Sequence, residues 1–144
     1  MSEDLFREIE ELSTQVCPEE AIGLLAGEAG GTVKSVLPLR NIAPLGRFLA
    51  DPYEQFQAER AIKKAGLKLL AIFHSHPWGG ANLSPEDLSF AQHWECAHVV
   101  FAFNPDTRHQ WELRAFIFKQ GSVEEVPVKI EGELLLKSNI KDRA

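Results

Sequence analysis

The chain has the length and composition of one folded domain. Hydrophobic residues make up 44% of its 144 residues and charged residues 25%, as in a globular protein with a substantial core. The net charge of −6 and the lack of a dense basic stripe argue against nucleic-acid binding. No run approaches the ~20 apolar residues that a membrane span needs, and the acidic N-terminus lacks the apolar core of a signal peptide. We therefore expect a soluble, cytoplasmic protein with no membrane or nucleic-acid partner.

A helix and two strands are predicted at the start of the chain. Ser2 can cap a helix in which apolar residues recur at helical spacing as far as Val16. Pro18 then prevents a simple continuation of that helix. Residues 21–26 predict a buried strand, and the glycine-rich turn after them leads into a second strand at residues 32–37.

A loop, a second helix and a third strand come next. The loop covers residues 38–50, and Asp51 then stands as an N-cap before Pro52 at the first helical position. This helix is expected to continue to about residue 65, where a glycine closes it. Four of its residues are expected to face inward: Phe56, Ala61, Ile62 and Ala65. The apolar run at residues 67–73 predicts a strand buried on both faces.

The rest of the chain predicts a helix that opens at Ser84 and then three strands. The strands are expected at residues 97–103, 109–118 and 123–130, separated by turns that contain Asn, Pro, Asp and Gly. An amphipathic tail follows at residues 131–144. Since no repeat or linker interrupts this order, we expect a single domain over residues 1–144, with its core at about 18–130.

The stretch from His74 to Asp87 contains a group of possible metal ligands. His74 and His76 follow a predicted strand, and side chains two apart on a strand point to the same side. Asp87 can supply a third ligand after a loop that two glycines allow to bend back. Two imidazoles and one carboxylate, with a fourth position left for water, are typical of a catalytic zinc site.

Each part of this group also has a plain structural interpretation. A His-x-His pair alone is common among ordinary surface or core residues. Ser84 is a good N-cap, and Asp87 can complete a capping box in place of the usual Glu. From the local sequence pattern alone, both helix capping and metal binding remain open for Asp87. The two roles are compatible, because a ligand at the start of a helix is held firmly.

The wider pattern resembles the JAMM (MPN-plus) metalloprotease family. The family motif is an upstream Glu, then His-x-His, seven residues, and Ser-x-x-Asp; here seven residues separate His76 from Ser84. The upstream Glu lies in a Pro-x-Glu-x-x-Gly context, which Glu20 matches, with Glu19 as the competing candidate. Two departures are Ile22, where relatives often have Cys, and Leu83, where many have Pro.

The resemblance implies a fold, a cofactor and site residues. The fold is of the α/β (α+β) class, with a curved mixed β-sheet flanked by helices, similar to the cytidine deaminase architecture. His74, His76 and Asp87 would bind Zn²⁺, Glu20 would accept and return the proton of the attacking water, and Ser84 would donate to the oxyanion. The motifs of the common zincins and of nucleobase deaminases are absent from the sequence.

The function implied is that of a compact, prokaryotic-type zinc metallopeptidase. Such relatives hydrolyse a peptide or isopeptide bond at the C-terminal Gly-Gly tail of a ubiquitin-like or sulfur-carrier protein. A catalytically silent MPN-type scaffold or protein-interaction module is the alternative, although silent relatives typically lose motif residues that this chain keeps. A general small-peptide hydrolase is a third hypothesis, and a homodimer is left open.

The remaining chemistry-bearing residues receive structural interpretations. Three other histidines lack metal-ligand spacing and are interpreted as structural or surface residues: His93, His98 and His109. Cys17 and Cys96 are too few and too far apart for a disulfide framework, so we expect reduced thiols. Trp78 is compatible with a substrate-facing wall and with simple packing.

Overall fold

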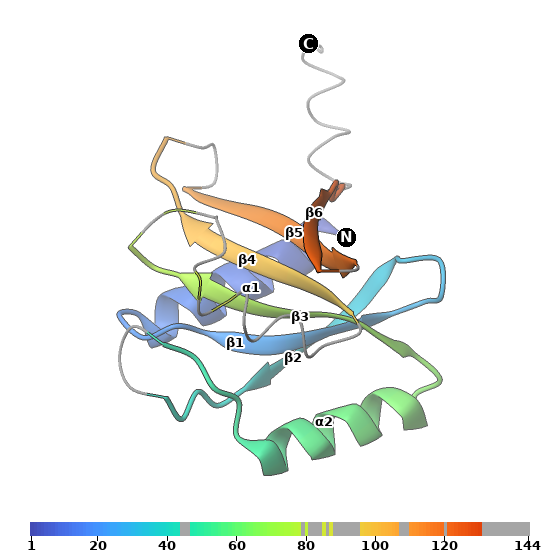
Figure 1. Cartoon of the computed structure of the whole chain (residues 1–144). Coiled ribbons are helices and arrows are strands. Elements are labelled where there is room, and N and C mark those ends of the chain that lie inside the picture. Colours follow the sequence, from blue (N-terminus) through green and yellow to red (C-terminus); the bar gives the residue numbers. More distant parts are fainter. Residues whose placement is uncertain are drawn as a thin grey trace.

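The computed structural model describes residues 1–43, 47–78, 80, 85, 87, 96–106, 110–119 and 121–130. Within these residues the chain forms two helices, α1 (Glu3–Val16) and α2 (Pro52–Lys64). Its strands are β1 (Ile22–Gly27), β2 (Val33–Leu39), β3 (Lys68–His76), β4 (Ala97–Phe103), β5 (Trp111–Lys119) and β6 (Ser122–Val126). They form one sheet in the order β2-β1-β3-β4-β5-β6, in which β3 and β4 are parallel and all other neighbours antiparallel (Figure 1).

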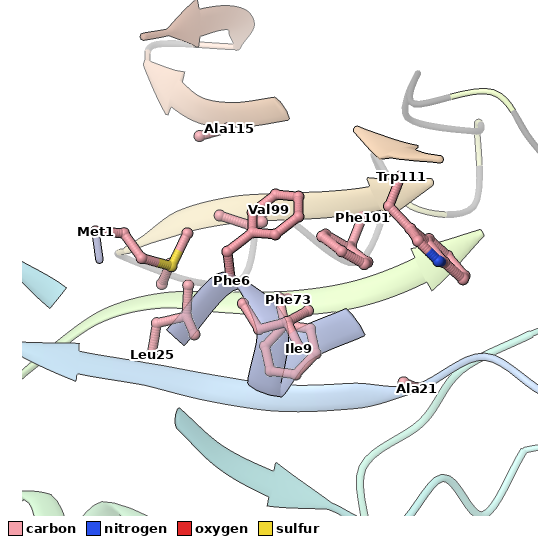
Figure 2. Close-up of a cluster of buried hydrophobic side chains, with 11 residues drawn as sticks. Met1, Phe6, Ile9, Ala21, Leu25, Phe73, Val99, Phe101, Trp111 and Ala115 are labelled. Atoms are coloured by element: carbon pink, nitrogen blue, oxygen red, sulfur yellow. The ribbon is translucent and has the colours of Figure 1, made fainter. Parts of the chain in front are cut away.

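Helix α1 covers one face of this sheet. Its N-cap is the predicted one, since Ser2 Oγ accepts a hydrogen bond from the Leu5 N–H at 3.2 Å. Phe6 and Ile9 are buried against the sheet, where the Phe6 ring meets Phe101 edge-on at 5.1 Å. Figure 2 shows these side chains packed with Phe73 of β3 in a continuous apolar layer. This layer is the main core, and it lies on the side of β3 away from His74.

Helix α2 packs on the opposite face through a narrow stripe. Ile62 is its buried residue, and it joins an apolar cluster with residues of β1 and β3. The prediction of the inward face is wrong for Phe56, Ala61 and Ala65, because all three are exposed, Phe56 by 58%. The helix contacts the sheet along the line of Ala58 and Ile62, four residues apart, and this line excludes the other three from the contact.

The element boundaries differ from the predicted ones at a few places. Strand β2 continues two residues further, through Pro38, which an edge strand tolerates. Strand β6 ends at Val126 because Pro127 has no N–H to donate to a ladder. The helix predicted from Ser84 and the tail at 131–144 lie outside the described residues, apart from Pro85 and Asp87, which are helical.

The predicted fold class is confirmed, as a mixed sheet flanked by two helices. The domain bounds 1–144 and the likeness to the cytidine deaminase architecture stay predictions. Among the described residues, no helix is long and apolar enough to cross a membrane.

Candidate metal centre

The sheet register brings Glu20 to the end of β3. Strand β1 runs antiparallel to β3 with Ile22 opposite His74, so the residue two before Ile22 comes level with His76. His74 and His76 lie two residues apart at the end of β3, on the face away from α1. One carboxylate oxygen of Glu20 and one nitrogen of each imidazole lie within 4.8 Å of one another. Residues far apart in the sequence thus form one polar cluster.

Ser75 lies between the two histidines in the sequence and on the opposite face of β3, and two hydrogen bonds join it to the residue just before β1. Its Oγ accepts a hydrogen bond from the Ala21 N–H at 2.7 Å, and its own N–H donates to the Ala21 carbonyl at 2.9 Å. Ser75 is fully buried, so both bonds are shielded from water. The residue before Ala21 is Glu20, and its main chain is therefore fixed relative to the His pair.

Of the two candidate glutamates, Glu20 is the one that enters the site. Its side chain is buried, with 4% exposed, whereas Glu19 is exposed. Asn41 Nδ2 donates a hydrogen bond to the Glu20 carbonyl at 3.0 Å, which holds the same residue from the side of β2.

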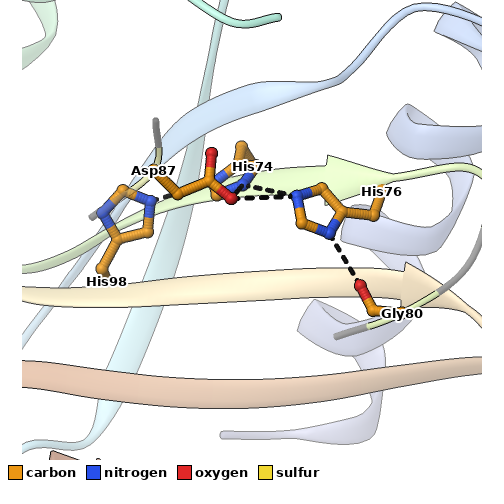
Figure 3. Close-up of polar contacts among 5 residues, drawn as sticks. All are labelled: His74, His76, Gly80, Asp87 and His98. Carbon is orange, nitrogen blue, oxygen red and sulfur yellow. Dashed lines mark hydrogen bonds and ion pairs between the residues drawn. The ribbon is translucent and has the colours of Figure 1, made fainter. Parts of the chain in front are cut away.

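Asp87 joins the two imidazoles at the centre of the cluster (Figure 3). Its Oδ2 lies 3.2 Å from Nε2 of His74 and 3.2 Å from Nε2 of His76, and these two nitrogens are 3.0 Å apart. Asp87 is buried, with 4% of the residue exposed. Three donor atoms, two nitrogens and one carboxylate oxygen, therefore converge on one point.

These donors fit a divalent metal ion. A tetrahedral zinc with bonds of about 2.0–2.1 Å places neighbouring ligand atoms about 3.3 Å apart. The three spacings of 3.0–3.2 Å are close to that value. Each imidazole also has a partner on its other nitrogen, since His76 Nδ1 is 2.7 Å from the Gly80 carbonyl oxygen and His74 Nδ1 is 2.9 Å from Nε2 of His98. Such outer partners orient metal-binding histidines.

Burial and charge set the protonation of the three histidines. Burial lowers the pKa of His74 although Asp87 opposes the shift. Burial, with the neighbouring His74, lowers the pKa of His98 to about 3. Burial also acts to lower the pKa of His76, but the Asp87 carboxylate, the Gly80 carbonyl and the charge of Glu20 outweigh it and raise this pKa. His74 and His98 are therefore neutral imidazoles at pH 7.

The structure thus places four of the five predicted site residues in one cluster: Glu20, His74, His76 and Asp87. Ser84 lies outside the described residues. The Trp78 side chain is 56% exposed, which does not fit the packing alternative. Cys17 and Cys96 are free thiols.

Sequence reasoning missed the contact of His98 with this cluster. His98 is buried, which agrees with a structural residue, but it is 24 residues from His74 in the chain and touches it. The available signal was a histidine near the start of a predicted buried strand, where a polar side chain needs a partner. The identity of that partner depends on the parallel pairing of β3 with β4, which motif spacing does not reveal.

Comparison with known proteins assigns the chain to a family. The profile of the prokaryotic homologs of the JAB domain, Prok-JAB, matches residues 2–114. The chain belongs to this family. The resemblance to compact JAMM-type proteins, drawn from the motif, is thereby confirmed.

Two named relatives and one solved structure illustrate the family. The chain is 40% identical over 106 residues to a "Probable TtuB-protein conjugate cleaving protease" of Thermus thermophilus, covering 72% of this chain and 65% of that protein. It is 31% identical over 115 residues to a "CysO-cysteine peptidase" of Mycobacterium tuberculosis, covering 78% and 77%. A protein of Desulfitobacterium hafniense has a solution structure with a TM-score of 0.76 and 28% identity, covering 91% and 94%. The match spans just under two thirds of the Thermus protein.

Proposed function

We propose that this chain is a zinc-dependent peptidase that hydrolyses a peptide or isopeptide bond at the C-terminal Gly-Gly tail of a ubiquitin-like or sulfur-carrier protein. The observation that carries the proposal is the convergence of three donor atoms, from His74, His76 and Asp87, beside the buried Glu20. Relatives named as a conjugate cleaving protease and a CysO-cysteine peptidase support the reaction class and the kind of substrate.

His74, His76 and Asp87 would hold the zinc ion. A bound zinc supplies a Lewis acid for the scissile carbonyl and lowers the pKa of water. Two neutral imidazoles and one carboxylate leave a net positive charge on the ion, and this charge favours both effects. The burial of Asp87 and His74 keeps bulk water away from two of the three ligands.

Glu20 is the proposed proton carrier. Its carboxylate takes a proton from water as the oxygen bonds to the carbonyl carbon, and returns that proton to the leaving amine as the C–N bond breaks. Its place beside both histidines puts it within reach of a water molecule held at the same point. We propose Ser84 as a donor to the developing oxyanion and the exposed Trp78 as a wall of the substrate path.

The first test is the zinc content of the purified protein. We expect about one zinc per chain in the wild type, and loss of zinc in His76→Ala and Asp87→Ala, since each variant removes one of three protein ligands. Thermal unfolding of the variants without metal checks that they fold. If the wild-type protein folds but holds no zinc under metal-replete conditions, the proposal of a zinc enzyme would be wrong, and a binding scaffold would be favoured.

The second test addresses the substrate. Carrier proteins that end in Gly-Gly are joined either to a following peptide or to a lysine side chain, and cleavage is followed by mass spectrometry. We expect cleavage directly after the second glycine, and loss of it in Glu20→Gln. Equal cleavage of carriers ending in Gly-Gly and Ala-Ala would contradict the proposed tail specificity and favour a general peptidase.

A further inference from the structure

A buried histidine of β4 contacts His74 on the side away from the metal centre. Nε2 of His98 lies 2.9 Å from Nδ1 of His74, and the two rings meet edge-on with their centroids 4.9 Å apart. The His98 side chain is 2% exposed. Figure 3 shows the order of the contacts: His98 meets His74, which in turn meets Asp87 and His76.

We propose that His98 is a positioning residue: it accepts a hydrogen bond from Nδ1–H of His74 and so keeps the lone pair of His74 Nε2 directed at the metal. This role rests on the proposed function, because it concerns the zinc ligand that the function needs. It goes beyond the family motif, which does not include His98.

The proposal follows from where the single proton between the two facing ring nitrogens, Nδ1 of His74 and Nε2 of His98, can sit. Either His74 donates through Nδ1, or His98 donates through Nε2. If His98 donated, the one remaining proton of His74 would be on Nε2, which points at His76 and Asp87. A protonated nitrogen cannot bind a metal. Only the arrangement in which His98 accepts is therefore compatible with a metal at this point.

The surroundings of the two rings support a fixed orientation. Phe48 stacks on the face of His74, with centroids 4.1 Å apart and planes at 14°, and its ring lies 5.8 Å from that of His98, centroid to centroid, with the planes at 68°. The stacked ring restricts rotation of the His74 imidazole, so the ring nitrogens have defined partners. Phe48 fixes the plane of the ring, and His98 selects its tautomer.

A neutral acceptor also has an electrostatic consequence. Carboxylates and backbone carbonyls are the common partners of metal-binding histidines, and a carboxylate adds a negative charge near the ion. An imidazole that accepts a hydrogen bond through Nε2 is the neutral form, so His98 in this role orients His74 without that added charge. The only anionic ligand proposed for the metal is then Asp87, and the ion retains more of its positive charge.

The test compares zinc affinity in His98→Phe and His98→Gln by competition with a chromophoric chelator. Phe keeps an aromatic ring but accepts no hydrogen bond, so we expect a loss of about 10- to 100-fold in zinc affinity. Gln offers a carbonyl oxygen near the position of Nε2, so we expect it to recover most of the affinity. Val99→Ala, which creates a cavity on the other face of β4, is the matched control and should leave zinc affinity within about twofold.

A direct measurement covers the case in which His98→Phe fails to fold. Long-range proton–nitrogen correlation spectra of the zinc-loaded wild type should show His74 protonated on Nδ1 and His98 unprotonated on Nε2. A proton on Nε2 of His98, or equal affinity losses in the Phe and Gln variants, would overturn the role of His98 while the zinc site stands. A wild type that binds no zinc would instead overturn the proposed function and, with it, this role.

Discussion

On one face of β3, Ala71 and Phe73 pack against α1 in a layer of apolar and aromatic side chains, whereas on the other face Ile72 is followed by His74 and His76. Both faces are buried, but one buries apolar side chains and the other also buries ionisable ones. On the α1 face, the described core cluster consists of apolar and aromatic side chains. The other face holds imidazoles and carboxylates in a place where water is scarce and charges interact strongly.

The comparison shows how one strand can separate stability from chemistry. Alternation of side chains along β3 assigns each residue to one of the two tasks. Substitutions on the α1 face should therefore change the free energy of unfolding and leave the metal centre intact. Substitutions on the other face should change metal binding or turnover at a smaller cost in stability.

The largest effect is expected for Glu20→Gln. This change removes the proton carrier but keeps the size of the side chain, so turnover should fall by about 10²- to 10⁴-fold. The neighbouring Glu19→Gln is the matched control, because Glu19 is exposed, and it should keep wild-type turnover. Zinc content distinguishes the two roles that Glu20 can have. If Glu20→Gln lost its zinc, Glu20 would be a ligand and its assignment as proton carrier would be wrong.

Phe73→Ala tests the opposite face. Phe73 is fully buried, and its ring fills the space that Gly23 leaves open: a Cβ on Gly23 would come within 2.4 Å of it. Removing the ring should lower the free energy of unfolding by about 3–5 kcal/mol, measured by urea denaturation. The folded variant should still bind one zinc per chain. Loss of zinc from folded Phe73→Ala would show that the two faces are coupled, contrary to the comparison.

The two cysteines are expected to differ in reactivity because one is exposed and the other is packed against a core cluster. Cys17 is exposed at the end of α1, whereas Cys96 packs against the apolar cluster on the α2 side. Burial raises the pKa of the Cys96 thiol from 9.0 to about 11. The thiolate is the reactive form, so at pH 8 Cys96 should react about a hundredfold more slowly than a thiol of ordinary pKa.

Iodoacetamide labelling followed by peptide mass spectrometry measures this difference. Cys17 should be modified first, and the Cys96 rate should rise about tenfold between pH 8 and pH 9, because its thiolate fraction still grows below a pKa of about 11. Labelling in urea, where both thiols are exposed, is the control. Similar rates for both cysteines in the folded protein would contradict the burial of Cys96.

Local signals predicted most of the fold. The caps at Ser2 and Asp51 are correct because a cap depends on a few neighbouring residues, and the strand at 97–103 is correct because its apolar run is continuous. The shared face of His74 and His76 follows from the two-residue period of a strand. The motif spacing that pointed to Glu20 and Asp87 came from a resemblance, and no local signal would have brought them together.

Features that depend on tertiary pairing escaped prediction. The inward face of α2 was misjudged because its apolar residues are scattered, so the position of the helix on the sheet decides which of them are covered. The contact of His98 with His74 depends on the register of β4 against β3. The hydrogen bonds of the Asn41 side chain also escaped prediction, because only the folded loop after β2 brings its partners together.

Asn41 links the loop after β2 to the metal centre, and its substitution should have the smallest effect of the four. Its Nδ2 donates to the carbonyl oxygens of Glu20 and Arg47 at 3.0 and 2.9 Å, and its Oδ1 accepts from the N–H groups of Ala43 and Leu49 at 2.9 and 3.0 Å. Asn41→Ala removes all four bonds and should cost about 1–3 kcal/mol in the free energy of unfolding. We also expect lower turnover with zinc content unchanged.

Asn41→Asp separates the two halves of this network. A carboxylate can still accept from Ala43 and Leu49, but it cannot donate to Glu20 or Arg47. If the bond to the Glu20 carbonyl positions the proton carrier, turnover should fall in the Asp variant as much as in the Ala variant, while the loss of stability is smaller. If turnover falls only in Asn41→Ala, the order of the loop matters and the direct bond to Glu20 does not. The two results therefore distinguish whether the Nδ2 donor or the Oδ1 acceptor of Asn41 links the loop to the site.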